Sequence, residues 1–121
     1  MEFSVRQIKK SLVQWIRNWF EKNGKDCNAV VGISGGKDSS VCAALCVEAL
    51  GKDRVIGVMM PNGQQSDIDD SRMLVQHLGI KHYTMDISGA VGAVREQFYR
   101  IGIQESEQTV INLPPRIRMS V

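Results

Sequence analysis

The chain has 121 residues and a mass of 13.5 kDa, so it is one domain or part of one. Hydrophobic residues make up 43% and charged residues 23%, as is usual for a globular protein. The formal net charge of +2 is too small to indicate a nucleic-acid partner. No apolar run is long enough to span a bilayer, so we expect no membrane partner.

Residues 1–24 predict a leading amphipathic helix. Ser4 and Gln7 form a capping-box pattern, and Gly24 is the expected stop. One apolar stripe follows at helical spacing, made of Val5, Ile8, Leu12, Trp15, Ile16 and Trp19. A basic amphipathic N-terminus is also typical of a transit peptide or a membrane-surface helix. It has neither an apolar signal core nor a small-residue cleavage site, so we expect a packed helix in a cytoplasmic protein.

Residues 28–121 alternate between strand and helix patterns. Buried strands are expected at 29–33 and 55–60, and a strand with alternating apolar residues at 83–87. Each strand is followed by an expected helix, at about 38–50, 66–79 and 91–101 respectively. This alternation predicts an α/β fold with a doubly wound parallel sheet, so that residues 1–121 form the N-terminal part of a single domain. Residues 112–119 read as a loop entering a further helix, with Pro114 and Pro115 in its first turn. The sequence stops at Val121, one turn into that expected helix, so the chain looks truncated within the domain.

Cysteine usage does not indicate a disulfide framework. There are three cysteines, Cys27, Cys42 and Cys46, an odd count without a signal peptide. Cys42 and Cys46 are four residues apart on a predicted helix and are expected to be small core residues. His77 and His82 lack partners at ligand spacing and are expected at the surface.

The segment Gly32-Ile33-Ser34-Gly35-Gly36-Lys37-Asp38-Ser39-Ser40 lies between a predicted strand and a predicted helix. Consecutive glycines allow backbone N–H groups to approach a ligand closely, and the start of the helix adds positive potential. The serine hydroxyls supply further donors. A carboxylate such as Asp38 would repel a polyphosphate, which favours a bridging Mg²⁺ between the two.

Two common phosphate motifs are absent. Three residues separate Gly32 from Gly36, where a Walker A loop has four, and no dinucleotide G-x-G-x-x-G occurs. The hexapeptide S-G-G-x-D-S at 34–39 instead resembles the pyrophosphate loop of the ATP pyrophosphatases, which split ATP into AMP and pyrophosphate. The alternative is a glycine-rich turn that binds no ligand.

Two further stretches select a family within that superfamily. Residues 60–70 resemble the P-x-G-x-Q-x-D-x-D-D run of NAD synthetases, and residues 112–119 resemble that family's N-x-x-x-R-x-R-M segment. Met85-Asp86-Ile87 and the leading helix also match in position. Met59 departs from the pattern, because many members carry arginine there. The resemblance is to ammonia-dependent NAD synthetases and spans nearly the whole chain.

This resemblance implies a reaction in which deamido-NAD, ATP and ammonia give NAD, AMP and pyrophosphate through an adenylated intermediate. It implies that Asp38 binds Mg²⁺, that Arg116 binds deamido-NAD, and that the protein is a homodimer. It assigns ATP binding to Gly32, Ile33, Ser34, Gly35, Gly36, Lys37, Asp38, Ser39 and Gln65. It assigns no catalytic side chain within these residues.

The family has further ligands downstream of Val121, so the 121 residues alone are expected not to complete catalysis. The strand at 29–33 would also lack a later sheet partner. Free ammonia is the expected nitrogen source, because no glutaminase segment is present. Alternatives are another ATP pyrophosphatase, such as a GMP synthetase or a tRNA-modifying enzyme, and a non-catalytic adenine-nucleotide-binding protein. CxxC pairs would favour the tRNA-modifying type, and the sequence contains none.

Overall fold

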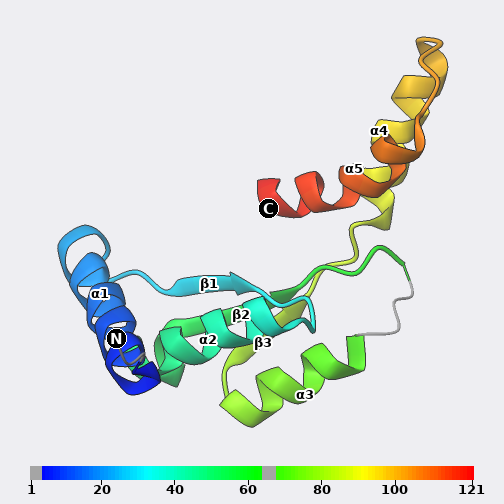
Figure 1. Ribbon diagram of the computed structural model, residues 1–121. Helices are drawn as coiled ribbons and strands as arrows, with labels where there is room; N and C mark the ends of the chain where they lie inside the picture. The colour runs from blue at the N-terminus through cyan, green and yellow to red at the C-terminus, as the bar shows by residue number, and fades with distance from the viewer. Residues whose placement is uncertain (1–3, 64–67) are drawn as a thin grey trace.

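The computed structural model describes residues 4–63 and 68–121. A leading helix is followed by three strand–helix units and a last helix (Figure 1). The elements are α1 (Val5–Asn23), β1 (Ala29–Gly32), α2 (Lys37–Leu50), the short 3-10 helix η1 (Lys52–Arg54), β2 (Val55–Met59), α3 (Ile68–Leu78), β3 (Lys81–Thr84), α4 (Ser88–Arg100) and α5 (Glu107–Ser120).

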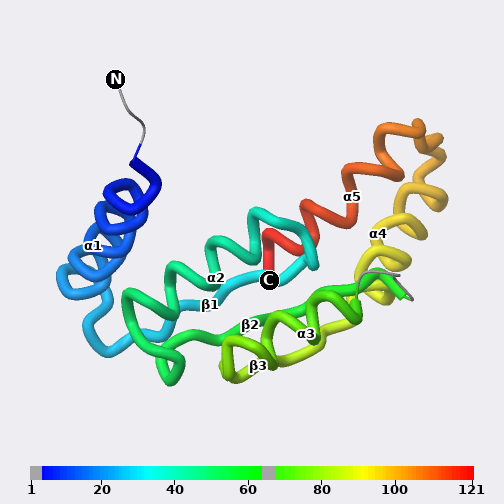
Figure 2. Tube along the Cα trace, turned by 60° about the horizontal axis from the view of Figure 1, so that its bottom comes forward, coloured from blue at the N-terminus to red at the C-terminus, as the bar shows by residue number. Residues whose placement is uncertain are grey.

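The three strands form one parallel sheet in the order β1-β2-β3, which confirms the predicted parallel α/β class. Ala29 of β1 is opposite Val55 of β2, and Ile56 of β2 is opposite Lys81 of β3. Helices α2 and α3 pack beside each other against the strands (Figures 1 and 2). The described strands thus follow one another in space as they do in the chain, with their carboxyl ends at a single edge.

The core lies between the sheet and these two helices. Its buried members are Ala29, Val31, Ile33, Ala43, Cys46, Val55, Met59, Val75 and Ile80. Gly57 sits at its tightest point, where an added Cβ would meet side chains of three core residues at 3.1–3.2 Å. A side chain larger than hydrogen therefore does not fit at this position without displacing its neighbours.

Helix α1 begins as predicted, because the Ser4 side chain accepts a hydrogen bond from the Gln7 N–H at 3.3 Å. Arg17 then joins α1 to the end of α2 by donating to the carbonyls of Glu48 and Ala49 at 3.2 and 3.0 Å. Most of the predicted apolar stripe is not packed, however. The exposed members are Val5, Ile8, Leu12, Trp15 and Trp19, whereas Val13 is buried and Ile16 and Phe20 pack against the core. Helix α1 is thus packed as predicted, but through only part of the predicted stripe, because α2 covers only the neighbouring face of α1.

The C-terminal segment corrects another expectation. Residues 112–119 are not a loop entering a helix but the middle and end of α5, which starts at Glu107. Ser106 caps this helix by accepting from the Thr109 N–H at 3.2 Å. Pro114 and Pro115 lie inside the helix, where they supply no N–H to the carbonyls four residues earlier. The early cap and packing against α4 start the helix well before the prolines.

Three smaller features complete the description. β3 begins at Lys81, earlier than expected, and ends at Thr84. After its end, the N–H groups of Met85 and Ile87 still donate to the carbonyls of Met59 and Pro61, so the chain stays paired with the β2 side. Cys46 is buried as predicted, but Cys42 is exposed, so the expectation of a core position was wrong for Cys42. Within the described ranges, no helix is both long and apolar enough to cross a membrane.

Candidate functional site at the carboxyl ends of the strands

The candidate anion-binding loop, residues 32–40, connects β1 to α2 and includes the first turn of that helix. Gly35 has a φ of 85°, a conformation that side chains with a Cβ rarely adopt. Gly36 is the N-cap of α2 and makes no side-chain capping bond. The first N–H groups of α2 are therefore directed out of the helix end, where the helix dipole also favours an anion.

A small network of hydroxyl groups holds the loop in shape. The Oγ atoms of Ser34 and Ser39 are 3.0 Å apart, and Ser39 Oγ accepts from the Ser34 N–H at 3.1 Å. Ser34 Oγ accepts from the Gly36 N–H at 3.2 Å. Ser40 Oγ donates to the Gly36 carbonyl at 2.7 Å. The loop is thus preorganised by its own side chains, with Ser34 and Ser39 side by side at its mouth.

Both charged residues of the loop, Lys37 and Asp38, are exposed in the first turn of α2. The donor set fits a hard cation shared with a polyphosphate, because one carboxylate and phosphate oxygens are ligands that Mg²⁺ prefers, with water completing the shell. The described residues contain no group of three His, Cys, Asp or Glu side chains that would hold a metal without such a ligand.

A cavity of about 390 Å³ lies next to this loop. Gly32, Ile33 and Ser34 line one side, and Met59, Met60 and Pro61 at the end of β2 line another. Ile68 and Ser71 of α3 and Arg118 and Met119 of α5 complete the lining. In Figures 1 and 2 the last turn of α5 comes back over the sheet, on the side of the loop. The cavity combines apolar walls, an anion-binding loop and one guanidinium group.

Arg118 closes the cavity at the end of α5. Its Nε donates to the Met60 carbonyl at 2.7 Å, across 58 residues of chain. Arg116, the predicted ligand of deamido-NAD, is exposed and is not part of the cavity lining. Gln65, the predicted nucleoside contact, lies outside the described residues. The structure thus brings Gly32, Ile33 and Ser34 to the cavity and leaves Arg116 apart from it.

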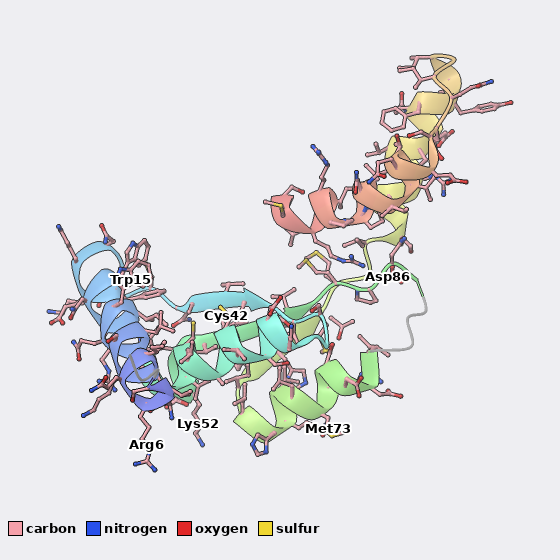
Figure 3. The ribbon with its side chains drawn as sticks, viewed as in Figure 1. Arg6, Trp15, Cys42, Lys52, Met73 and Asp86 are labelled. Carbon is pink, nitrogen blue, oxygen red and sulfur yellow. The ribbon has the colours of Figure 1, made fainter. Side chains whose placement is uncertain are left out.

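Asp86 supports the same edge from the end of β3, where the sheet leads into α4 (Figure 3). Its carboxylate accepts from the N–H groups of Ser88 at 2.8 Å and Gly63 at 3.2 Å. These hydrogen bonds, that of Ser88 first, hold the pKa of Asp86 below its usual value. Asp86 therefore ties the loop after β2 to the start of α4.

Sequence reasoning did not find Ser71 or the roles of Arg118 and Met119. Ser71 stands in a helix where nothing in its spacing indicates a ligand, and Met119 was recognised only as the last residue of the 112–119 motif. Arg118 was inside a recognised motif, but the motif alone does not say which of its two arginines turns toward the sheet. The contact between Arg118 and Met60 depends on where α5 returns, which only the fold reveals.

A parallel sheet whose first strand leads through a glycine–serine loop into an uncapped helix defines an α/β protein with a candidate anion-binding site at the carboxyl ends of its strands. Comparison with sequence models of known families identifies the family within this class. A sequence model of the NAD synthase family matches residues 8–121, and the chain belongs to that family.

Individual relatives agree with this assignment. The chain is 44% identical over 128 residues to an NH₃-dependent NAD⁺ synthetase of Methanosarcina acetivorans, covering 100% of this chain and 47% of the relative. It is 38% identical to the corresponding protein of Methanocaldococcus jannaschii, covering 98% of this chain and 46% of the relative. The chain thus spans about half the length of the curated relatives that it matches.

Solved structures give the same result. An NH₃-dependent NAD synthetase from Campylobacter jejuni, in complex with a nitrate ion, superposes with a TM-score of 0.85 at 27% identity, covering 98% of this chain and 50% of that one. An NMN synthetase from Francisella tularensis has a TM-score of 0.80 at 30% identity, covering 98% and 48%. The fold of these residues is therefore shared by synthetases with two differently named products.

Proposed function

We propose that the protein containing this chain is an ammonia-dependent NAD synthetase that converts deamido-NAD, ATP and ammonia into NAD, AMP and pyrophosphate. The main support is the preorganised loop, whose Ser34 and Ser39 lie beside an uncapped helix end. Family membership over residues 8–121 supports the same activity. The chain covers about half of its relatives, so the proposal concerns the whole protein.

The reaction has two steps. A carboxylate oxygen of the nicotinate group attacks the α-phosphorus of ATP, and the bond from that phosphorus to the pyrophosphate oxygen breaks. Ammonia nitrogen then attacks the activated carbonyl carbon, AMP leaves with the electron pair of the C–O bond, and the nitrogen loses a proton. Both steps need an anionic leaving group to be stabilised.

The loop is suited to hold that leaving group. The N–H groups at the start of α2 offer fixed donors to pyrophosphate oxygens, and the bonded hydroxyl groups of Ser34 and Ser39 hold the loop around them in shape. These donors are already in place before the ligand binds, so little reorganisation opposes the reaction. The neighbouring apolar cavity, with Met59 and Met60 in its walls, is suited to the adenosine part of ATP.

Asp38 would hold the Mg²⁺ that accompanies ATP, and Mg²⁺ bound there would neutralise charge on the phosphate oxygens. Lys37, beside it, is placed to add positive charge at the same helix end. We assign deamido-NAD binding to Arg116 and a contact with the ATP nucleoside to Gln65, on their match to the family motifs. We further propose a cytoplasmic homodimer, for which the exposed apolar positions of α1 offer surface.

The test uses protein expressed from the complete reading frame, mixed with deamido-NAD, ATP, Mg²⁺ and ammonium. We expect NAD and AMP to form in equal amounts. Asp38→Asn should lower kcat/KM about 10²–10³-fold, because it removes the carboxylate that would hold the charge-neutralising Mg²⁺ at the leaving group. Asp53→Asn is the matched control, since Asp53 is an exposed acid in the short helix η1, outside the lining of the cavity.

Each alternative gives a different result in the same assay. Formation of nicotinamide mononucleotide from its nicotinate precursor, without NAD, would favour the activity for which the Francisella protein is named. AMP formation only with a different acceptor would indicate a GMP synthetase or a tRNA-modifying enzyme. ATP binding without AMP release would indicate a non-catalytic nucleotide-binding protein.

A further inference from the structure

The end of β2 presents a backbone carbonyl that the sheet cannot satisfy. On the β1 side, Ile33 N–H donates to the Val58 carbonyl at 2.9 Å. On the β3 side, the Met59 and Pro61 carbonyls accept from Met85 and Ile87 at 2.7 and 2.8 Å. Successive carbonyls of β2 point alternately to β1 and to β3. The Met60 carbonyl, two residues after Val58, is therefore directed to the β1 side. There the chain has already turned away into the anion-binding loop, because Gly35 adopts a positive φ.

Arg118 takes the place of the missing strand donor. Its Nε donates to the Met60 carbonyl at 2.7 Å, a short distance for a charge-assisted hydrogen bond. The guanidinium retains its other N–H donors, and it is the only cationic side chain among the described residues that line the cavity. One side chain therefore both completes the edge of the sheet and brings positive charge to the cavity.

The end of α5, which carries Arg118, follows two consecutive prolines. Pro114 and Pro115 leave the helix without two of its internal hydrogen bonds, and a helix bends easily at such a point. The part before the prolines packs with α4, whereas the part after them returns toward the loop (Figures 1 and 2). Arg118 lies in this returning part, two residues from Arg116.

We propose that Arg118 is a positioning residue of the proposed synthetase: its bond to the Met60 carbonyl fixes the returning half of α5 over the nucleotide cavity. The Pro114–Pro115 step is the flexible point, and the Arg118 contact selects the closed position. This holds Met119 in the cavity wall and sets where Arg116 meets the second substrate. The role rests on the proposed function, since it concerns binding of ATP and deamido-NAD.

The test compares Arg118→Gln and Arg118→Lys in protein from the complete reading frame. Glutamine removes the charge and shortens the side chain, whereas lysine keeps the charge and can still donate to the Met60 carbonyl, without the planar fork of arginine. Arg100→Ala is the control, because Arg100 is an exposed arginine of α4 whose ion pair is with Glu96. We expect Arg118→Gln to lower kcat/KM about 10²-fold, mainly through a higher KM, as for a misplaced binding group. Arg118→Lys should recover part of this loss, and Arg100→Ala should have no effect.

Hydrogen–deuterium exchange supplies a readout that does not depend on turnover. Without ligand, amides of residues 116–121 should exchange faster in Arg118→Gln, whereas those of β1 and β2 should not change. An unchanged rate at 116–121, or faster exchange over the whole sheet, would overturn the positioning role. If Arg118→Gln does not fold, the same comparison is made with Arg118→Lys, which should show a smaller increase confined to the same residues. If the wild-type protein makes no NAD, the proposed function fails, while the exchange result still decides whether Arg118 holds α5.

Discussion

Substitution of Gly57 by alanine tests the packing that supports the site. A Cβ at this position would lie 3.1 Å from Val75 Cγ1 and 3.2 Å from both Ile33 Cγ1 and Ile80 Cδ1. Each neighbour would have to retreat by a few tenths of an ångström. All three are at most 5% exposed. Val75 and Ile80 are held in the close-packed core, where little space is left for them to move, whereas Ile33 also lines the cavity.

The expected cost follows from two opposing terms. Overpacking a closed core costs about 1–3 kcal/mol. Replacing glycine also reduces the entropy of the unfolded chain, which returns about 0.4–1 kcal/mol. We therefore expect Gly57→Ala to lower the free energy of unfolding by roughly 1–2 kcal/mol. For a protein about twice the length of this chain, that corresponds to a Tm lower by roughly 2–8 °C.

Thermal and urea unfolding of protein from the complete reading frame would measure this change. Gly89→Ala is the matched control, because Gly89 lies in α4 and an added Cβ there meets nothing within 4 Å. It should leave stability unchanged or raise it by up to about 1 kcal/mol. If Gly57→Ala proves as stable as wild type, the core around Ile33 is looser than the distances indicate, and the reasoning fails.

Two further predictions concern ionisable groups. The Ser88 and Gly63 N–H groups lower the pKa of Asp86 in the folded protein. Its charged form therefore stabilises the fold at pH values above the pKa that Asp86 has in the unfolded chain. This contribution is lost as pH falls through the lower pKa that it has in the folded protein. Asp86→Asn should therefore be less stable than wild type at neutral pH, with a difference that shrinks below about pH 4; a difference independent of pH would contradict this origin. Burial, followed by the neighbouring Cys42, raises the pKa of Cys46 to about 11. In folded protein at about pH 8, a maleimide reagent should modify the exposed Cys27 and Cys42 and spare Cys46, as checked by peptide mass spectrometry; equally rapid modification of Cys46 would show that its helix opens.

The part of the fold predicted best is the part specified by neighbouring residues. The strand at Ala29, the glycine turn and the helix that follows occupy consecutive positions, so apolar pattern and turn chemistry were sufficient to identify them. The structure confirms their order and the parallel sheet. Helix α5 was misjudged because proline usually opens or breaks a helix. A cap at Ser106 starts this helix a full two turns before Pro114.

The features that sequence reasoning missed depend on distant residues. The apolar stripe of α1 was visible, but whether α2 or solvent faces each position depends on how the two helices cross. Arg95 of α4 pairs with Glu105 through hydrogen bonds of 2.8–3.1 Å and so holds the turn that sends α5 back toward the sheet. No local pattern links these two residues, and none links Arg118 to Met60.

Ile33 connects the core to the candidate site. Its side chain belongs to the buried cluster, its N–H donates to the Val58 carbonyl, and it also lines the cavity beside Ser34. A change in packing at Gly57 therefore reaches the cavity through Ile33, whereas a change at Asp38 alters only the exposed helix end. Loop substitutions should accordingly reduce activity without reducing stability, and Gly57→Ala should reduce stability and weaken ATP binding together.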